Sequence, residues 1–191
     1  AMAVGLDGVI QDPFGGQQDL KDGVIRCVGN PETRFSEDAL RILRGLRFAS
    51  RLGFSIAPET AAAMERQKAL LAYVSGERIY KELTGILIGA YAQQVLEQYG
   101  SVLTAVLPEL QPSMGFLQHS PFHNRDVWQH TLEALGKSQP DPLVRWALLL
   151  HDLGKPYCFT LDNRGIGHFY GHPQRSMELA EIIFDRLHGD K

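Results

Sequence analysis

The fold class is decided by one stretch of the sequence, SEDALRILRGLRFASRLG, which begins at Ser36 and ends at Gly53. Serine is a preferred N-cap residue, acids in a first turn favour the positive end of the helix dipole, and glycine commonly ends a helix. At roughly 100° per residue, the apolar side chains fall on one face and three arginines on the other. The stretch therefore predicts an amphipathic helix. Its apolar face holds Ala39, Ile42, Leu43, Leu46 and Ala49, and its polar face holds Arg44, Arg47 and Arg51.

Helical patterns also occupy much of the chain on both sides of this stretch. Pro58 is well placed as a first helical residue and Ser75 as an N-cap, and glycines end several of the patterns. Strand signals are short: they cover residues 9–10, residues 24–28 and a hairpin around the turn DNRG (162–165). We therefore expect a mainly α fold with a short β remnant at the N-terminus. The further helices are predicted at 58–71, 76–89, 91–99, 124–135, 141–153 and 173–187.

Composition places the chain among ordinary globular proteins and excludes several classes. Its 191 residues are 44% hydrophobic and 21% charged, with a formal net charge of −3. These values exclude a disordered chain, a collagen-like repeat and a coiled coil. The apolar runs are too short for a membrane span, and no signal peptide opens the chain. Two cysteines, Cys27 and Cys158, are too few for a disulfide scaffold, so a reducing, cytoplasmic location is expected.

The histidines are distributed unevenly, because all seven lie after residue 118. Histidine is a common metal ligand and proton shuttle, so this distribution indicates two regions with different chemistry. A loop punctuated by Pro108, Pro112 and Pro121 separates the two regions. The second region contains His119, His123, His130, His151, His168, His172 and His188.

The pair His151-Asp152 follows an apolar helical pattern and is able to bind one cation from two directions. His130, on the preceding predicted helix, would supply a third ligand, and His172 a further ligand or a donor to phosphate. Lys155 is placed to neutralise a phosphate near the metal, which would itself activate a bound water. The alternative is that the dipeptide occurs by chance and that His130 simply packs on its helix.

A second candidate site lies in the segment 26–51, which has six arginines, no lysine and three acids. In a weakly acidic chain, such a segment indicates a local surface for phosphates or bases. Asp38 offers acceptors and Arg41 offers planar donors, so together they could read the edge of a base. The alternative is an ion pair between residues three apart on a helix surface, worth a few tenths of a kcal/mol.

The sequence HDLGK (151–155), with histidines about 20 residues before and after it, resembles the HD phosphohydrolase superfamily. This resemblance implies a site for one or two divalent metals that cleaves phosphate esters, with Mg²⁺, Mn²⁺ or a transition metal as the ion. The last aspartate ligand of that superfamily follows further helices, so neither Asp185 nor Asp190 matches it. The implied ligands are His130, His151 and Asp152, with His172 as a further candidate.

Several further motifs belong together: DPFGG (12–16), RFSEDALRILR (34–44), RFA (47–49), LGF (52–54), SGERI (75–79) and KEL (81–83). With these motifs the chain resembles the class II tRNA nucleotidyltransferases and poly(A) polymerases. The resemblance covers essentially the whole chain, because many bacterial members carry an HD domain after the neck and body. It implies addition of CCA, or of A alone, to tRNA 3′ ends, with tRNA, CTP and ATP as partners and Mg²⁺ as the ion for the transfer.

The same resemblance implies roles for individual residues. Asp38 and Arg41 would form a protein template that pairs with the base of CTP or ATP, and Arg44 would belong to the same nucleotide-binding set. The helix that carries this template would be braced by Glu77 and Arg78. A flexible link between head and neck would contain Asp12, Gly15 and Gly16.

The resemblance also divides the chain into three parts. Residues 1–28 would be a remnant of the nucleotidyltransferase head, residues 29–112 the helical neck and body, and residues 113–191 a C-terminally truncated HD domain. The paired carboxylates that hold two Mg²⁺ would lie before residue 1, so no catalytic residue for nucleotidyl transfer is expected in this chain. Two other functions stay open: a phosphohydrolase acting on cyclic or 2′-phosphates, and a non-catalytic tRNA-binding module. The sequence leaves the oligomeric state undetermined.

Overall fold

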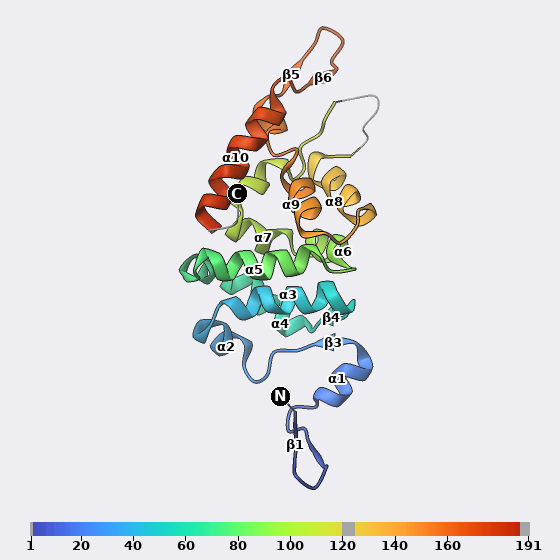
Figure 1. Cartoon of the computed structure of the whole chain (residues 1–191), viewed down its shortest axis with the longest axis vertical. Helices are drawn as coiled ribbons and strands as arrows, with labels where there is room; N and C mark the ends of the chain where they lie inside the picture. The colour runs from blue at the N-terminus through green and yellow to red at the C-terminus, as the bar shows by residue number, and fades with distance from the viewer. Residues whose placement is uncertain (1, 120–124, 188–191) are drawn as a thin grey trace.

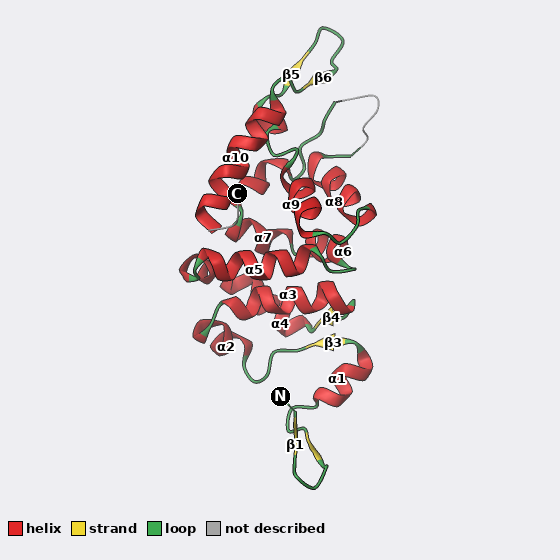
Figure 2. Cartoon of the chain, in the orientation of Figure 1, coloured by secondary structure: helices red, strands yellow, loops and turns green. Residues whose placement is uncertain are grey.

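The computed structural model describes residues 2–119 and 125–187, and it confirms a mainly α fold (Figure 1, Figure 2). The molecule is elongated, and its helices are arranged in successive layers along the long axis (Figure 1). Within the described ranges, no helix is long and apolar enough to cross a membrane. The predicted helix start at residue 124 and two of the histidines, His123 and His188, lie outside the described residues.

The N-terminal segment is built from short elements, including one helix that the sequence pattern did not predict. This helix, α1, begins where the Asp12 carboxylate accepts the backbone N–H of Gly16 at 2.7 Å and that of Gln17 at 2.8 Å. Gly15 precedes it with φ 69°, a left-handed conformation that glycine adopts without strain. The elements are β1 (Ala3–Val4) paired antiparallel with β2 (Ile10–Gln11), α1 (Gly16–Asp22), and β3 (Val24–Ile25) paired parallel with β4 (Ser55–Ile56).

The stretch that decides the fold class forms two helices, so the prediction of one helix starting at Ser36 was wrong. Asn30 caps α2 (Pro31–Glu37), and α3 (Leu40–Leu52) begins only after Asp38. The Asp38 backbone is extended, with φ −154° and ψ 99°, and its carboxylate accepts the N–H two residues further on. A short acceptor side chain that bonds nearby backbone in this way competes with continuation of the helix. A base-reading candidate therefore lies at a junction between two helices.

The apolar face predicted for this stretch is confirmed, because all five of its residues are buried. α3 packs against α5 (Gly76–Leu87), and α2 packs on α4 (Pro58–Gln67). The α-helix predicted at 58–71 ends at Gln67, and the chain continues as a 3₁₀ helix. A further helix, α7 (Gly100–Val106), was not predicted. The elements are α4 (Pro58–Gln67), η1 (Lys68–Tyr73), α5 (Gly76–Leu87), α6 (Ala92–Gln98), α7 (Gly100–Val106) and η2 (Pro108–Ser113).

The C-terminal part follows the predicted order of two helices, a hairpin and a last helix. Asp126 and Asp141 cap the first two helices, each through a side-chain oxygen that accepts a backbone N–H. The predicted turn at 162–165 connects the hairpin strands, and Asp162 closes it by accepting two backbone N–H groups. The elements are α8 (Val127–Lys137), α9 (Pro142–Leu150), η3 (Lys155–Tyr157), β5 (Thr160–Leu161), β6 (Gly167–His168) and α10 (His172–Leu187).

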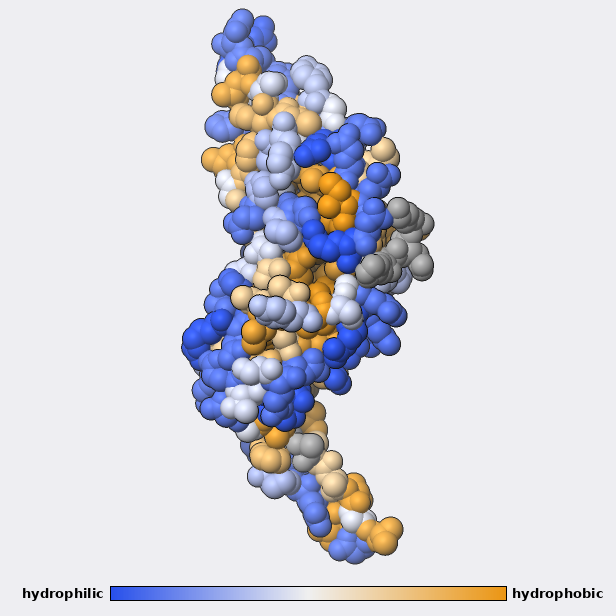
Figure 3. All heavy atoms as spheres, turned by 90° about the vertical axis from the view of Figure 1, so that its left-hand side faces the viewer, coloured by the Kyte–Doolittle hydropathy of each residue, from blue (hydrophilic) through white to orange (hydrophobic). Residues whose placement is uncertain are grey.

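One hydrophobic core runs through both parts of the chain. α5 contacts α3 on one side and both α9 and α10 on the other. At this second contact, the Trp146 ring stacks on Tyr80 with ring centroids 5.5 Å apart and also touches Phe184, and its indole N–H donates to Thr84 at 2.9 Å. On the face shown in Figure 3, apolar atoms gather at the waist between the two parts. The domain division at residue 112 stays a prediction, since the two parts share their core.

Candidate functional site

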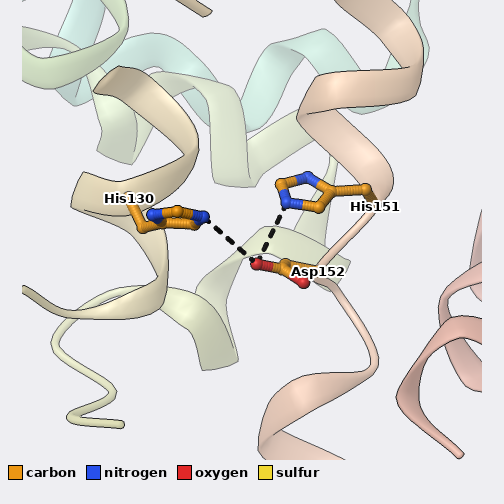
Figure 4. Close-up of side chains that lie close together, drawn as sticks. All are labelled: His130, His151 and Asp152. Atoms are coloured by element: carbon orange, nitrogen blue, oxygen red, sulfur yellow. Dashed lines mark ion pairs between the residues drawn. The ribbon is translucent and has the colours of Figure 1, made fainter. Parts of the chain in front are cut away.

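Three of the predicted metal ligands lie together at one end of α9 (Figure 4). His130 comes from α8, and His151 and Asp152 follow directly after α9. The Asp152 Oδ2 atom is 3.1 Å from His151 Nε2 and 3.9 Å from His130 Nε2. One ligand atom from each of the three residues lies within 4.8 Å of the others. Among the described residues, this is the one group of three or more potential ligands that is close enough to share a metal ion.

The apolar sequence of α9 explains how the cluster is positioned. Leu149 and Leu150 are buried, so the helix end is fixed against the core and the chain turns at His151. The His151 ring is held by a contact of 2.7 Å between its Nδ1 atom and the Leu148 carbonyl, and this leaves Nε2 facing Asp152. A histidine whose second nitrogen is fixed in this way has a defined tautomer and orientation.

His172 lies on the opposite side of the Asp152 carboxylate. Its Nε2 is 3.5 Å from Asp152 Oδ1, and its Nδ1 is 2.7 Å from the Phe169 carbonyl. Gly154 allows this approach, because a Cβ at that position would collide with the His172 carbonyl and lie 2.8 Å from the backbone nitrogen of Ser176. The start of α10 is therefore packed directly on the turn that carries His151 and Asp152.

Charges near Asp152 keep its carboxylate ionised although only 3% of the residue is exposed. Burial alone would raise the pKa of Asp152, but hydrogen bonds and attraction from His151 and Lys155 outweigh it and lower the pKa to about 2. Burial favours the neutral ring of His151 and would lower its pKa. The neighbouring Asp152 carboxylate has the larger combined effect and raises the pKa of the ring. The cluster therefore contains a firmly negative oxygen between imidazole groups.

The donor atoms of this cluster fit a divalent metal. Two imidazole nitrogens and one carboxylate oxygen form a common set for zinc and for other first-row ions, and His172 is a nearby fourth candidate. The Asp152 Oδ2 atom is buried, and its partners among the described residues are the positively charged or ionisable side chains around it, His151 at 3.1 Å and Lys155 at 2.8 Å. A buried charged oxygen in that situation is a favourable place for a cation.

Lys155 lies inside this cluster, where the sequence predicted a residue that contacts phosphate. Its Nζ atom is 2.8 Å from Asp152 Oδ2 and donates to Gln118 Oε1 at 2.9 Å, and only 9% of the residue is exposed. Sequence reasoning did not single out Gln118, because one glutamine in a loop carries no pattern that identifies it. Its position 37 residues before Lys155 becomes meaningful only in the folded chain.

The second candidate site surrounds the junction of α2 and α3, but the structure does not pair Asp38 with Arg41. The Asp38 carboxylate lies 3.3 Å from the Arg78 guanidinium, which comes from α5. Arg41 instead donates to Glu37 and to the Arg34 carbonyl, each at 2.7 Å. The ion pair between Asp38 and Arg41, considered as the simplest alternative, is therefore absent from the described contacts.

Four of the six arginines in the segment 26–51 gather around one cleft of about 280 Å³. Phe48 and Met64 contribute to its apolar lining, and no acidic side chain lines it. Arg44 is exposed and makes no ion pair within the described part of the chain. The cleft thus combines positive charge with apolar surface, which suits a nucleotide. The four arginines are Arg26, Arg34, Arg41 and Arg44.

Arg47 was predicted on the polar face of the helix, and the structure shows this side chain packed against α5 and mostly shielded from solvent. Its guanidinium lies 3.1 Å from the buried carboxylate of Glu82 on α5, and Gly85 leaves room for its side chain. An Ala at position 85 would place a Cβ 2.5 Å from Arg47 Cδ. Arg47 therefore holds α3 to α5 and does not line the cleft. The KEL motif that contains Glu82 gave the one sequence signal that could have suggested this contact.

The remaining predicted residues lie in supporting positions. Glu77 is exposed in the first turn of α5, next to Arg78, whose guanidinium reaches Asp38. Asp12, Gly15 and Gly16 form the start of α1 and lie outside both sites.

Comparisons with known proteins agree on one family. Residues 53–114 match the family model described as "Probable RNA and SrmB- binding site of polymerase A". The chain is 36% identical over 98% of its length to the "Multifunctional CCA protein" of Nitrosococcus oceani, and 38% identical over 92% of its length to the "A-adding tRNA nucleotidyltransferase" of Deinococcus radiodurans. It spans 47% and 43% of the lengths of these two relatives, respectively.

A solved structure gives the same result for the fold. The CCA-adding enzyme of Bacillus stearothermophilus in complex with CTP matches 96% of this chain and 41% of its own, with a TM-score of 0.56 and 30% identity. Sequence and fold therefore show that the chain belongs to the family of tRNA nucleotidyltransferases and poly(A) polymerases.

Proposed function

We propose that the chain is the nucleotide-selecting and RNA-binding part of a tRNA nucleotidyltransferase that adds CCA, or A alone, to tRNA 3′ ends. The observation that carries this proposal is the arginine-lined cleft beside the α2–α3 junction, in a chain whose relatives are named for these activities. The match of residues 53–114 to an RNA-binding family model supports tRNA as the partner. We assign no step of nucleotidyl transfer itself to this chain.

Selection of the base would rest on Asp38 and Arg41. Cytosine and adenine both carry an exocyclic amino group, which donates a hydrogen bond to a carboxylate. Beside it each base has an acceptor atom to which a guanidinium can donate. For both side chains to contact one base, Asp38 must release Arg78 and accept a hydrogen bond from the amino group. Arg41 must likewise release Glu37 and donate to the acceptor atoms of the base. Arg78 and Glu37 would therefore hold the two reading groups in place until a nucleotide arrives.

The test measures CTP and ATP affinity in the full-length protein that carries this chain. Asp38→Ala and Arg41→Ala are expected to weaken binding of both nucleotides by about ten-fold or more, because each removes hydrogen bonds to a base edge. Arg51→Ala is a matched control, since Arg51 is an exposed arginine of α3 that does not line the cleft. Equal affinities in all the variants would contradict the assignment.

We infer a second function, a metal-dependent phosphohydrolase, from the cluster of His130, His151 and Asp152. A bound metal would supply a water of lowered pKa and would polarise a phosphoryl oxygen. The protein would contribute two fixed imidazoles, an ionised carboxylate and, close by, the ammonium of Lys155. Cyclic and 2′-phosphates are the proposed substrates.

The test of this function uses hydrolysis of bis(p-nitrophenyl) phosphate and of 2′,3′-cyclic nucleotides with Mn²⁺ or Ni²⁺ added. His151→Ala and Asp152→Ala should abolish turnover. His168→Ala should retain it, because His168 lies in the hairpin and pairs with Asp162 outside the cluster. Turnover that survives His151→Ala would exclude this site as its origin.

A further inference from the structure

The ammonium of Lys155 occupies a place in the His–Asp cluster where a metal would also need to be. His130 Nε2, His151 Nε2 and Lys155 Nζ all face the same atom, Asp152 Oδ2, at 3.9, 3.1 and 2.8 Å. A metal held by the two histidines and this oxygen would share the oxygen with an ammonium group. Two cations on one buried oxygen repel each other, and burial strengthens that repulsion because solvent screens it poorly.

Lys155 has other partners that do not depend on Asp152. Its Nζ atom donates to Gln118 Oε1 at 2.9 Å and lies 5.5 Å from the centre of the Phe169 ring. Both contacts favour a positive charge, and neither partner carries a negative charge of its own. The ammonium would therefore stay beside the cluster even if Asp152 Oδ2 were taken by another cation.

Gln118 is itself fixed firmly enough to hold Lys155. Only 1% of the residue is exposed, and its amide nitrogen donates to the Arg125 carbonyl at 3.4 Å. Gly167 of β6 packs against its backbone carbonyl, where a Cβ would collide. A buried amide with both its oxygen and its nitrogen engaged is a rigid and neutral acceptor.

We propose that Lys155 is a resident cation of the cluster that competes with a divalent metal for Asp152 Oδ2, and that Gln118 is the positioning residue that retains Lys155. This inference rests on the phosphohydrolase function proposed above. When a metal is bound, Lys155 gives up Asp152 Oδ2 but keeps Gln118 and Phe169. Its remaining N–H donors are then available to the phosphate oxygens of a substrate. Lys155 thus balances the charge of Asp152 in the metal-free protein and contacts phosphate in the loaded one.

The sign of a change in metal affinity separates this proposal from a purely structural ion pair. Removing a competing charge tightens metal binding, whereas removing a structural support loosens it. The experiment titrates Mn²⁺ into the chain by calorimetry and follows inorganic phosphate binding to the Mn²⁺-loaded chain by ³¹P NMR. The variants are Lys155→Met, Lys155→Arg and Gln118→Leu, with Lys137→Met as control because Lys137 is an exposed lysine paired with Glu133 on α8.

We expect Lys155→Met to bind Mn²⁺ about ten-fold more tightly and phosphate about ten-fold more weakly. Gln118→Leu should change both affinities in the same directions by smaller factors. Lys155→Arg should bind Mn²⁺ nearly as the parent chain does, since it keeps the charge, and the control should match the parent in both measurements. Circular dichroism of each variant verifies that it is folded.

Weaker or unchanged Mn²⁺ binding in folded Lys155→Met would overturn the proposal and leave Lys155 as a structural residue. Mn²⁺ binding that appears only after Lys155→Met would support competition. If neither form binds Mn²⁺, the proposal fails together with the metal site. The phosphohydrolase function is judged separately, because turnover that depends on His151 with no change in Mn²⁺ affinity removes only the inference about Lys155.

Discussion

At the scale of single residues, the contact between Asp152 and Lys155 has a large energetic consequence. Both residues are almost entirely buried, and each is the nearest opposite charge to the other. A buried ion pair contributes little net stability compared with apolar residues, but removal of one partner leaves an uncompensated charge. The two single substitutions and the double substitution should therefore behave very differently.

Asp152→Asn is expected to destabilise the chain by about 3 kcal/mol, because it leaves the Lys155 ammonium buried without its counter-charge. Asp152→Asn combined with Lys155→Met should regain most of that loss, since no buried charge then remains unpaired. Urea unfolding of the parent, both single variants and the double variant gives the coupling energy. Additive effects would show that the contact is weak.

The same carboxylate predicts a dependence of stability on pH. The pKa of Asp152 is about 2 in the folded chain, below its ordinary value of 3.8, so its ionised form stabilises the fold at pH values above 3.8. This contribution falls as pH decreases from 3.8 toward 2. The pKa of His151 is raised, so its contribution is complete below its ordinary value of 6.5 and falls as pH rises through the folded pKa. The urea midpoint of the parent should approach that of Asp152→Asn between about pH 4 and 2.

At the scale of elements, close contacts between helices depend on two glycines, Gly85 in the last turn of α5 and Gly89 just after that helix. A Cβ at Gly89 would lie 2.5 Å from the backbone oxygen of Ser50 and would also collide with the Ser50 hydroxyl. The three atoms nearest to a Cβ at Gly85 all belong to the flexible side chain of Arg47. A side chain can move away from an added Cβ more easily than backbone can. Substitution by alanine should therefore be tolerated better at Gly85 than at Gly89.

Gly89→Ala is expected to destabilise the chain by about 2 kcal/mol through overpacking against α3. Gly85→Ala should cost less, because the higher helix propensity of alanine, about 1 kcal/mol, offsets displacement of Arg47 from Glu82. Urea unfolding of both variants measures the difference. A Gly89→Ala chain as stable as the parent would show that α3 and α5 separate more easily than their packing indicates.

Sequence periodicity predicted local faces and helix ends better than it predicted partners. The buried face of α3 and the helix start at Asp141 follow from spacing and residue type, whereas the cap at Asp126 was not predicted. The break at Asp38 was missed, because an acceptor at a cap and an acceptor within a first turn look alike in sequence. The contact of Asp38 with Arg78, 40 residues away, depends on how α5 packs, which no local pattern records.

The site itself shows the same division. The HDLGK motif led to His151, Asp152 and Lys155, and His130 followed from its place on the preceding helix. Gln118 could not be found, because its importance arises from burial and from one contact across 37 residues. Whether the cluster binds metal stays a prediction, as does base selection by Asp38 and Arg41.

At the scale of the whole molecule, the buried residues of the described ranges form one continuous hydrophobic core. The core continues from α3 through α5 to α9 and α10, and α6 packs on α8. A domain is expected to have a core of its own, but here α5 contributes to both sides. The two candidate sites are therefore supported by one body of packed helices.

This packing predicts that the chain unfolds in a single thermal transition. The ratio of the calorimetric enthalpy to the van't Hoff enthalpy should be close to one, as in two-state unfolding. Trp146→Ala, which removes the contacts with Tyr80, Phe184 and Thr84, is expected to lower the transition temperature and reduce this ratio. Two separate transitions in the parent chain would contradict a shared core.

The hydrogen bond from Trp146 to Thr84 has a further consequence for the exchange of amide protons with solvent. Thr84 lies on α5, while Trp146 lies on α9, which ends directly before His151. A metal in the cluster would fix the end of α9 and, through Trp146, would restrain α5, so that local opening of that helix becomes rarer. Amide protons of α5 should therefore exchange with solvent more slowly when a metal is bound in the cluster.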